Sequence, residues 1–454
     1  MKKYFVIALV LMLALAIVAC NTASAPTTAP ATTAPQATTA ATTAPAATTA
    51  PTTAPSSGGN AVQLQFWHAQ SQAQQTALNG LIDQFNKSHP NIQVTGTYQG
   101  TYSDIYKKVT AGLAAGTPPD LAIAYQNDVA NYIKSDAVIP LDDMMKDPKI
   151  GFTADDLKDI FPSFIDHYPQ YGNKVYSMAF LRSLEVMYYN ADMLKAAGFN
   201  QPPATWDDFM KVCAAVTKGD TYCHELNPDA SRFAGWVFSR GGNLINADGK
   251  TVAFGDDASL ASLQWEADLF KNKYGMVIAK AFQDQTDFSL GKIAFTMGST
   301  AGLPFYDKAI KDTGKPFNWG IAPLPHSTPQ PSLDAYGPSV TIFKTTPEKQ
   351  QAAFVFLKWL MDKDPNATWV KATAYFPARQ STKDALTDYI KANPLYGQSF
   401  DWLQYGRGEP QVAAWNPIRG YILDALNAVA NNKATPADAL KTAVDKSNAE
   451  LAKP

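Results

Sequence analysis

From residue 61 onward, the hydrophobic positions alternate between two spacings. Val62, Leu64 and Phe66 alternate with polar residues, which predicts a half-buried strand. The stretch 77–85 then carries apolar residues at helical spacing, followed by a second strand from Ile92. A helix with Ser103 as its expected N-cap and a third strand at 121–125 complete the pattern.

Repeated strand–helix–strand units predict an α/β fold with largely parallel sheets and helices on both faces. Ligands of such sheets lie at the carboxyl ends of the strands. Gln126 follows the third strand at that end, and we therefore treat it as a candidate site residue.

The pattern before residue 60 is different. Lys2 and Lys3 precede an apolar run that ends at Ala19-Cys20, which predicts a signal peptide over 1–20. A small residue before a Cys in this position resembles a bacterial lipobox, so we expect Cys20 to be lipidated. The alternative is an ordinary secretory signal in which the Cys is incidental. The tract 21–59 is rich in Thr, Ala and Pro, and it is expected to act as an extended linker between the anchor and the folded part.

Composition excludes some classes of partner. The net charge of −2 gives no sign of nucleic-acid binding or of a polybasic membrane surface, so the lipid is the only expected membrane contact. Residues 60–454 are long enough for two domains, and we expect a monomer. Cys213 and Cys223 are expected to form a local disulfide outside the cytoplasm, with two buried free thiols as the alternative. No spacing of His and Cys indicates a metal site, and no cofactor is expected.

Enzyme signatures are largely missing. The five His residues form no metalloprotease pair, and the Gly298-Ser299-Thr300 turn lacks the spacing of a nucleophile elbow. A glycosidase needs two facing carboxylates, which a sequence alone does not exclude. We expect a protein that is not an enzyme and has no catalytic residue.

Two stretches point to binding. Ser299 follows a predicted strand and precedes a helix, where backbone N–H groups meet an anion or a sugar hydroxyl, unless the turn is a plain helix cap. In Asn416-Pro417-Ile418-Arg419, Asn416 reads as an N-cap and Arg419 lies in the first helical turn. An Arg at the positive end of a helix needs a compensating anion or acid. Arg419 is therefore either a ligand contact or a surface or carboxylate-paired residue.

Several stretches in order resemble the family 1 extracellular solute-binding proteins of ABC importers, most closely the glycerol-3-phosphate-binding branch. The stretches that carry this resemblance are "LQFWHAQ", "GTYQGTYSD", "TPPDLAIAY", "VMYYNADMLKAAGF", "PPATWDDF", "GKIAFTMGST", "WGIAPLP", "TAYFPARQ" and "NPIRGYILDAL". The resemblance covers nearly the whole folded part.

The resemblance implies a two-lobed periplasmic-binding-protein-like fold of type II, with a mainly parallel sheet in each lobe and three hinge crossings. The crossings are expected near 180–182, 319–323 and 375–377. They divide the chain into an N-terminal lobe (60–180 plus 319–376) and a C-terminal lobe (181–318 plus 377–454). The lobes close on the solute by hinge bending and deliver it to ABC permease subunits.

The family's contact positions fall on several residues of this chain, which are Tyr98, Ser183, Ser299, Gly337, Tyr375 and Arg419. In the glycerol-phosphate branch the last two resemble phosphate contacts. The chain departs from that branch at Gln126, where the branch has an acid, and at Arg182, which is new and is expected to make the cleft more positive. Trp236 and Trp67 are candidate stacking platforms, with packing in the core as the alternative.

The sequence thus predicts a lipid-anchored, extracytoplasmic solute-binding protein of an ABC importer. Its expected solute is glycerol-3-phosphate or a glycerophosphodiester, with a neutral oligosaccharide as the alternative. A secreted carbohydrate-active enzyme is the rival from another functional class.

Overall fold

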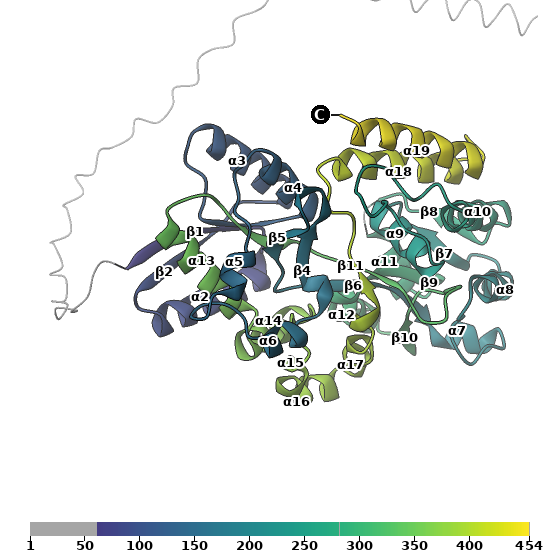
Figure 1. The fold of residues 1–454 in the computed structure, drawn as a ribbon. Coiled ribbons are helices and arrows are strands. Elements are labelled where there is room, and N and C mark those ends of the chain that lie inside the picture. The colour runs from purple at the N-terminus through teal and green to yellow at the C-terminus, as the bar shows by residue number, and fades with distance from the viewer. Residues whose placement is uncertain (1–60, 281, 454) are drawn as a thin grey trace, which may run out of the picture. The chain divides into compact units, whose positions relative to one another are not determined.

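The computed structural model describes residues 61–453 except 281, and these residues form two α/β lobes (Figure 1). The predicted signal peptide, Cys20 and the linker over 21–59 lie outside the described residues. Within the described part, no helix is long and apolar enough to cross a membrane.

The first lobe is built on a six-stranded sheet in the order β2-β1-β3-β12-β5-β4. Its strands are β1 (Val62–His68), β2 (Ile92–Tyr98), β3 (Leu121–Ala124), β4 (Ile165–Tyr168), β5 (Lys174–Met178) and β12 (Ser339–Ile342). Its helices are α2 (Gln72–Ser88), α3 (Tyr102–Ala114), α4 (Gln126–Lys134), α5 (Asp142–Lys146), α6 (Ala154–Asp159), α13 (Pro347–Leu360) and α14 (Lys363–Thr373), with the short turns η1 (Pro162–Phe164) and η2 (Pro169–Tyr171).

The sequence pattern explains the first strands and helices. Leu64 and Phe66 are buried on β1, as their alternation predicts, and α2 buries its helically spaced apolar residues. The predicted N-cap of α3 is wrong: Thr101 caps this helix, because its hydroxyl accepts from the Asp104 N–H while the Asp104 carboxylate accepts from the Thr101 N–H.

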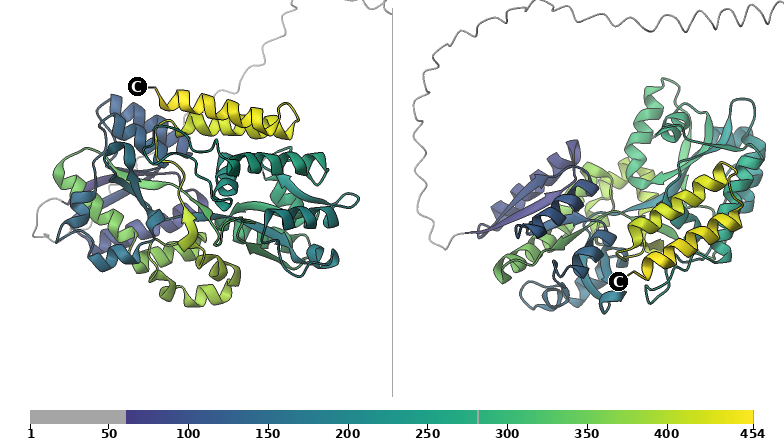
Figure 2. Two further views of the ribbon diagram at one scale, coloured as in Figure 1. Left: turned by 45° about the vertical axis from the view of Figure 1, so that its right-hand side comes forward. Right: turned by 90° about the horizontal axis from the view of Figure 1, so that it is seen from above.

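The second lobe contains a seven-stranded sheet in the order β13-β11-β6-β9-β7-β8, with β10 paired to β6. Its strands are β6 (Ser183–Asn190), β7 (Tyr222–Leu226), β8 (Gly275–Val277), β9 (Ile293–Ser299), β10 (Trp319–Ala322), β11 (Leu333–Tyr336) and β13 (Gly406–Arg407). Its helices are α7 (Ala191–Ala196), α8 (Trp206–Val216), α9 (Ala230–Ser239), α10 (Asp257–Lys271), α11 (Gln283–Ser289), α12 (Leu303–Asp312), α18 (Trp415–Ala430) and α19 (Pro436–Leu451), with the turn η3 (Thr300–Gly302). Helices α18 and α19 pack against each other and against α10 (Figure 2).

The predicted two-lobed α/β fold is confirmed: most strands of each sheet run in the same direction, although both sheets also contain antiparallel pairings. In the first lobe, β1 is parallel to β2 and to β3, but β12, β5 and β4 are joined by antiparallel pairings. In the second lobe, β6 is antiparallel to β9, β10 and β11. The strands β6 and β12 run against their neighbours where the chain enters a sheet from the other lobe, whereas β4 and β5 are antiparallel because a short turn joins them within the first lobe.

The chain passes from the first sheet to the second between Met178 and Ser183. The second crossing lies at Gly337-Pro338, between β11 and β12, and its predicted position at 319–323 is wrong. β10 occupies that stretch and pairs with β6 inside the second lobe. Gly337 has a φ of +139°, a backbone conformation that favours glycine at this sharp change of direction.

The third passage is spread over a longer segment. Phe376 bridges to Arg182, while Ala378 accepts a backbone hydrogen bond from Phe161 of the first lobe. Residues beyond the expected boundary at 376 therefore still contact the first lobe. Short helices continue the chain toward the second lobe, where α17 packs against β10. These elements are α15 (Thr382–Ala385), α16 (Thr387–Ala392), α17 (Pro394–Phe400) and η4 (Leu403–Tyr405).

A disulfide joins Cys213 on α8 to Cys223 on β7, as expected from the two cysteines. Both cysteines are buried in the apolar cluster of the second lobe, which also contains Trp236. The crosslink ties a helix to an inner strand of the sheet, and so it restricts the unfolded chain over this segment.

Candidate functional site

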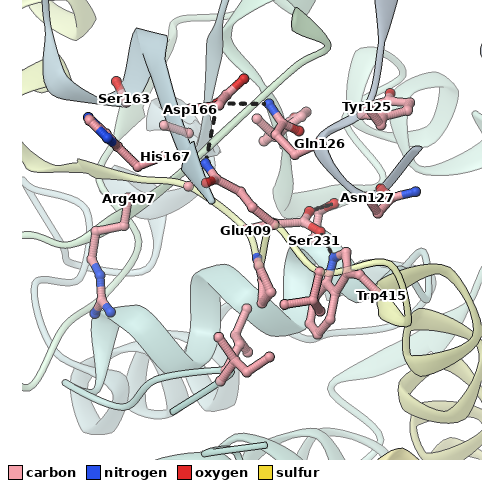
Figure 3. A pocket seen from close by; sticks show the side chains of 18 of the residues that line it. Tyr125, Gln126, Asn127, Ser163, Asp166, His167, Ser231, Arg407, Glu409 and Trp415 are labelled. Atoms are coloured by element: carbon pink, nitrogen blue, oxygen red, sulfur yellow. Dashed lines mark hydrogen bonds between the residues drawn. The ribbon is translucent and has the colours of Figure 1, made fainter. Parts of the chain in front are cut away.

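A cavity of about 530 Å³ lies between the two sheets (Figure 3). The first lobe contributes Tyr125, Gln126 and Asp166, and the second contributes Tyr336 and Glu409. This volume lies in the ordinary range for small-molecule sites. At one rim the lobes touch directly, because Gln170 donates to the Gly249 carbonyl at 2.6 Å.

Gln126 reaches the cavity because β3 ends at Ala124 and α4 begins at Gln126 itself. Its amide donates to Asp166 Oδ1 at 3.4 Å, to the Gly337 carbonyl at 3.2 Å and to Ser339 Oγ at 3.3 Å. Gln126 therefore lies at the carboxyl end of β3, as the sequence predicts. Gln126 also joins the first lobe to the crossing at Gly337.

Arg182 is only 1% exposed and is held by a network of acceptors. Its Nη2 lies 3.0 Å from Asp166 Oδ1 and 2.9 Å from Ser339 Oγ, while Nη1 donates to the carbonyls of Gly337 and Pro338. The prediction that Arg182 makes the cleft more positive is wrong, because the Asp166 carboxylate offsets its charge. Arg182 lines the cavity and at the same time fixes the crossing between the lobes.

Arg419 is also paired with acids. Nη1 bonds Glu409 Oε2 and donates to Ser231 Oγ at 3.0 Å, and Nη2 lies 3.4 Å from Asp229. Burial lowers the pKa of Arg419, but the nearby carboxylates of Glu409 and Asp229 raise it by a larger amount. The pKa of Arg419 therefore lies above its usual value. The carboxylate-paired alternative for Arg419 therefore describes the structure.

Glu409 organises this side of the cavity. Besides the bond to Arg419, its carboxylate accepts from Trp415 Nε1 at 2.6 Å and from the Ser231 hydroxyl. The helix α18 starts at Trp415, so the prediction that Asn416 is the N-cap is wrong. Asn416 instead lies in the first turn and donates to Asp128 Oδ1 of the first lobe at 3.1 Å.

Four of the predicted contacts line the cavity, which are Gln126, Arg182, Gly337 and Arg419. The stacking role predicted for Trp236 is wrong: its side chain is 0% exposed, packs on Trp265 and donates to Met297 Sδ. Trp67 is half-buried on β1 and packs against the apolar residues of the first lobe.

The other predicted contacts are not among the residues that line the cavity. Ser183 is buried and its Oγ is 3.5 Å from the Tyr336 carbonyl, and Ser299 is a hydrogen-bond partner of the Tyr336 phenol. Tyr375 pairs with Gln74, and Tyr98 is 45% exposed at the end of β2. Their role in binding stays a prediction.

Reasoning from the sequence missed the two carboxylates that balance the arginines. Asp166 lies in the short strand β4 and Glu409 in the segment between β13 and α18, and neither stands in a motif. One signal did exist, since an Arg near the start of a helix is electrostatically unfavourable unless an acid or an anion lies nearby. Sequence spacing does not say which acid supplies it.

Burial raises the pKa of several acids around the cavity. Asp128, 5% exposed, has its pKa raised to about 6 by burial, against the opposing effect of the bond from Asn416. Behind Tyr336, burial raises the pKa of Glu185 to about 7 although Arg232 lowers it. The described residues contain no group of three or more His, Cys, Asp or Glu side chains that could hold a metal ion.

The raised pKa of Asp128 predicts a pH-dependent effect of Asp128→Asn. The folded state holds the proton more tightly than the unfolded state, so stability is lost as pH rises from about 4 through 6. The substitution removes this loss, and its effect on the free energy of unfolding should become more favourable by about 2–3 kcal/mol between pH 4 and pH 8. Urea unfolding at both pH values measures the change, with Asp143→Asn on the exposed side of α5 as control. An equal effect of Asp128→Asn at the two pH values contradicts the prediction.

A polar cavity enclosed between two lobes is typical of proteins that bind a small molecule at that place. The chain belongs to the bacterial extracellular solute-binding protein family, whose model matches residues 80–398. The family resemblance expected from the sequence is thus confirmed, and so is an extracytoplasmic place of action. Members of this family are binding proteins.

Among similar proteins is the sn-glycerol-3-phosphate-binding periplasmic protein UgpB of Pectobacterium atrosepticum. It is 24% identical over 420 residues, which cover 86% of this chain and 91% of that protein. Two similar crystal structures confirm the fold. The cyclic α-maltosyl-1,6-maltose binding protein of Arthrobacter globiformis has a TM-score of 0.75 and 20% identity, covering 86% of this chain and 99% of the other. UgpB of Mycobacterium tuberculosis in complex with glycerophosphocholine has a TM-score of 0.72 and 20% identity, covering 87% and 99%.

Proposed function

We propose that this chain is the solute-binding component of an ABC import system and that it holds a hydroxylated solute in the cavity between its lobes. The observation that carries the proposal is the cavity itself, which neither lobe encloses alone and which both lobes line with polar groups. The solute is delivered to permease subunits, as is general for this class of importer.

The chemistry of the cavity favours hydroxyl groups. Glu409 offers a carboxylate, Gln126 and Asn127 offer amides, and Tyr125 offers a half-buried aromatic ring. Carboxylates and amides accept and donate hydrogen bonds to sugar hydroxyls, while an aromatic face covers the apolar side of a sugar ring. A carbohydrate is therefore the first candidate solute.

A glycerophosphodiester is the second candidate, and the two UgpB relatives support it. Its glycerol hydroxyls would suit the same carboxylate. Its phosphate would not gain a free cation at Arg419 or Arg182, because both guanidinium groups already face carboxylates. Because Arg182 and Arg419 are paired with carboxylates, we place a carbohydrate before a glycerophosphodiester, which is the reverse of the order expected from the sequence.

A thermal-shift screen of the full chain tests the proposal. The panel contains maltose, maltotriose, glycerol-3-phosphate, glycerophosphocholine and inorganic phosphate. A solute present at 100 times its dissociation constant should stabilise the fold by about 2.7 kcal/mol. Stabilisation by a sugar supports the first candidate and stabilisation by glycerophosphocholine supports the second. If no sugar and no glycerophosphodiester stabilises the chain, the proposed function is wrong.

We also propose that Cys20 carries a lipid that anchors the chain outside the cytoplasm. The support is the lipobox-like end of the apolar run and the Thr/Ala/Pro-rich tract that follows it. Cells grown with an alkyne-tagged palmitate should label the wild-type chain, and Cys20→Ala should abolish the label. Equal labelling of both chains contradicts the anchor.

A further inference from the structure

Three arginines line the cavity, and only two of them have a carboxylate partner. Arg182 pairs with Asp166, and Arg419 pairs with Glu409 and Asp229. Arg407, the third, has no ion pair with any residue that the structure describes in 61–453. A half-buried guanidinium without a carboxylate partner at the wall of a binding cavity is available to pair with an anion supplied from outside.

The position of Arg407 is fixed from two sides. It ends the short strand β13, and its guanidinium lies over the Phe238 ring of α9 with 4.2 Å between the guanidinium carbon and the ring centroid. Nη1 donates to the Gly242 carbonyl at 3.1 Å, and Nη2 donates to Asn243 Oδ1. A guanidinium has five N–H donors, so these two bonds leave donors for a ligand in a fixed, planar arrangement.

The acids nearest to Arg407 do not neutralise it. Asp334 is its register partner on β11, but it is fully buried, neither carboxyl oxygen has a hydrogen-bond partner among the described residues, and burial raises its pKa well above the usual range. Its carboxylate forms no ion pair with Arg407 in the part of the chain that the structure describes. Glu409, two residues further along the chain, is engaged by Arg419, Trp415 and Ser231.

The cavity thus has two chemically different sides. In Figure 3, Arg407 lies across the cavity from Tyr125 and Trp415. Asn243 lies beside Arg407 and accepts a hydrogen bond from it, whereas the Glu409 carboxylate lies beside Trp415 and Arg419. A solute with a hydroxylated part and an anionic part matches both sides at once.

We propose that Arg407 is the specificity-determining residue that binds an anionic group of the solute, a phosphate or a carboxylate, while the hydroxylated part lies toward Tyr125 and Glu409. The proposal rests on the proposed solute-binding function and deepens it. A guanidinium that is held flat on an aromatic ring presents a fork of N–H groups that matches two oxygens of an oxyanion. Such bonds are stronger than those between neutral groups, so among hydroxylated solutes Arg407 favours those that also carry an anionic group, such as an acidic sugar or a glycerophosphodiester.

Two matched pairs of probes test this assignment and separate its two sources of negative charge. Glucuronic acid and glucose differ by a carboxylate, and glycerophosphocholine and glycerol differ by the phosphodiester. We expect the full chain to bind one of the charged probes more tightly than its neutral partner in calorimetric titrations. Arg407→Gln should weaken binding of that probe by about 10- to 100-fold and leave maltotriose binding unchanged. Arg407→Lys should give an intermediate loss, because it keeps the charge but not the fork.

Arg240→Gln is the matched control. Arg240 also lies over an aromatic ring, Trp206 at 3.8 Å, but it does not line the cavity. This variant should bind every probe as the wild type does. Thermal unfolding of each variant without ligand checks that the fold is intact.

Three outcomes would overturn the assignment while leaving the proposed function in place. One is that Arg407→Gln binds the charged probe within about threefold of the wild type. Another is that it loses charged and neutral solutes equally, which would mark Arg407 as a structural residue. The third is that neutral sugars bind but no charged probe does, in which case the proposed function stands without the anion site. If no solute of either kind binds, the proposed function fails and this assignment fails with it.

Discussion

Arg182→Met is expected to lower the free energy of unfolding by about 3–5 kcal/mol. The substitution keeps an unbranched side chain of similar length at the crossing but removes the cation from Asp166. It leaves a buried carboxylate without its charge partner, and the carbonyls of Gly337 and Pro338 lose their donor. Loss of one member of a buried ion pair is far more costly than loss of the pair as a whole.

Denaturant unfolding measures this effect, and two further variants define its origin. Arg182→Met combined with Asp166→Leu removes both charges, and we expect it to be more stable than Arg182→Met alone. Lys308→Met breaks an ion pair with Asp312 in which both side chains are mostly exposed, and its effect should stay below about 1 kcal/mol. A loss of less than about 1 kcal/mol in Arg182→Met would contradict the central structural role of this residue.

Glu409→Gln is expected to weaken solute binding by about 10- to 100-fold. Glutamine has nearly the same shape, but it lacks the negative charge that holds Arg419 and that, in the proposed site, accepts hydrogen bonds from solute hydroxyls. The amide also presents an NH₂ group where the carboxylate accepts from Trp415 or Ser231. Calorimetric titration with the most stabilising solute of the panel measures the loss.

The direction of the effect of Glu409→Gln distinguishes two models of the cavity. If a phosphate bound directly at Arg419, removing the negative charge of Glu409 would strengthen the binding of phosphate-bearing solutes. The arrangement in which hydroxyl groups meet Glu409 predicts weaker binding of every solute. Glu348→Gln, in the exposed first turn of α13, serves as control. An affinity within threefold of the wild type would remove Glu409 from the site.

The local pattern of the sequence predicted the elements well. The alternation at Leu64 and Phe66 and the helical spacing up to Phe85 report directly which residues face the core. The disulfide between Cys213 and Cys223 followed from two cysteines on one short segment. Each of these features depends on residues that are near one another in the chain.

Sheet direction and the second crossing could not be predicted in the same way. The strand β12 enters the first sheet beside β3, although the two strands are far apart in the sequence, and its antiparallel register is set by the sharp crossing at Gly337. The stretch 319–322 has the composition of any buried strand, and nothing in it shows that β6 is its partner. Pairing between distant strands is decided by the whole fold.

The sequence predicted several residues of the site, but it did not predict the carboxylates that pair with the arginines. Arg419 and Gln126 reach the cavity because helix starts and strand ends are visible in the sequence. Trp236 has the residue type of a stacking platform, but its face of α9 turns to the core. The partners of the arginines come from distant segments, so the sequence could show neither that Arg419 is neutralised nor that Arg407 forms no ion pair within the described part of the chain.

The most direct test of the account is a calorimetric titration of the full chain with its most stabilising solute, followed by recovery of the solute and analysis of its bonds. A receptor that holds its solute between the lobes binds one molecule per chain, returns it unchanged, and loses affinity when Glu409 is replaced by Gln. Cleavage of the recovered solute, or binding that Glu409→Gln leaves untouched, would contradict the proposed function and its site.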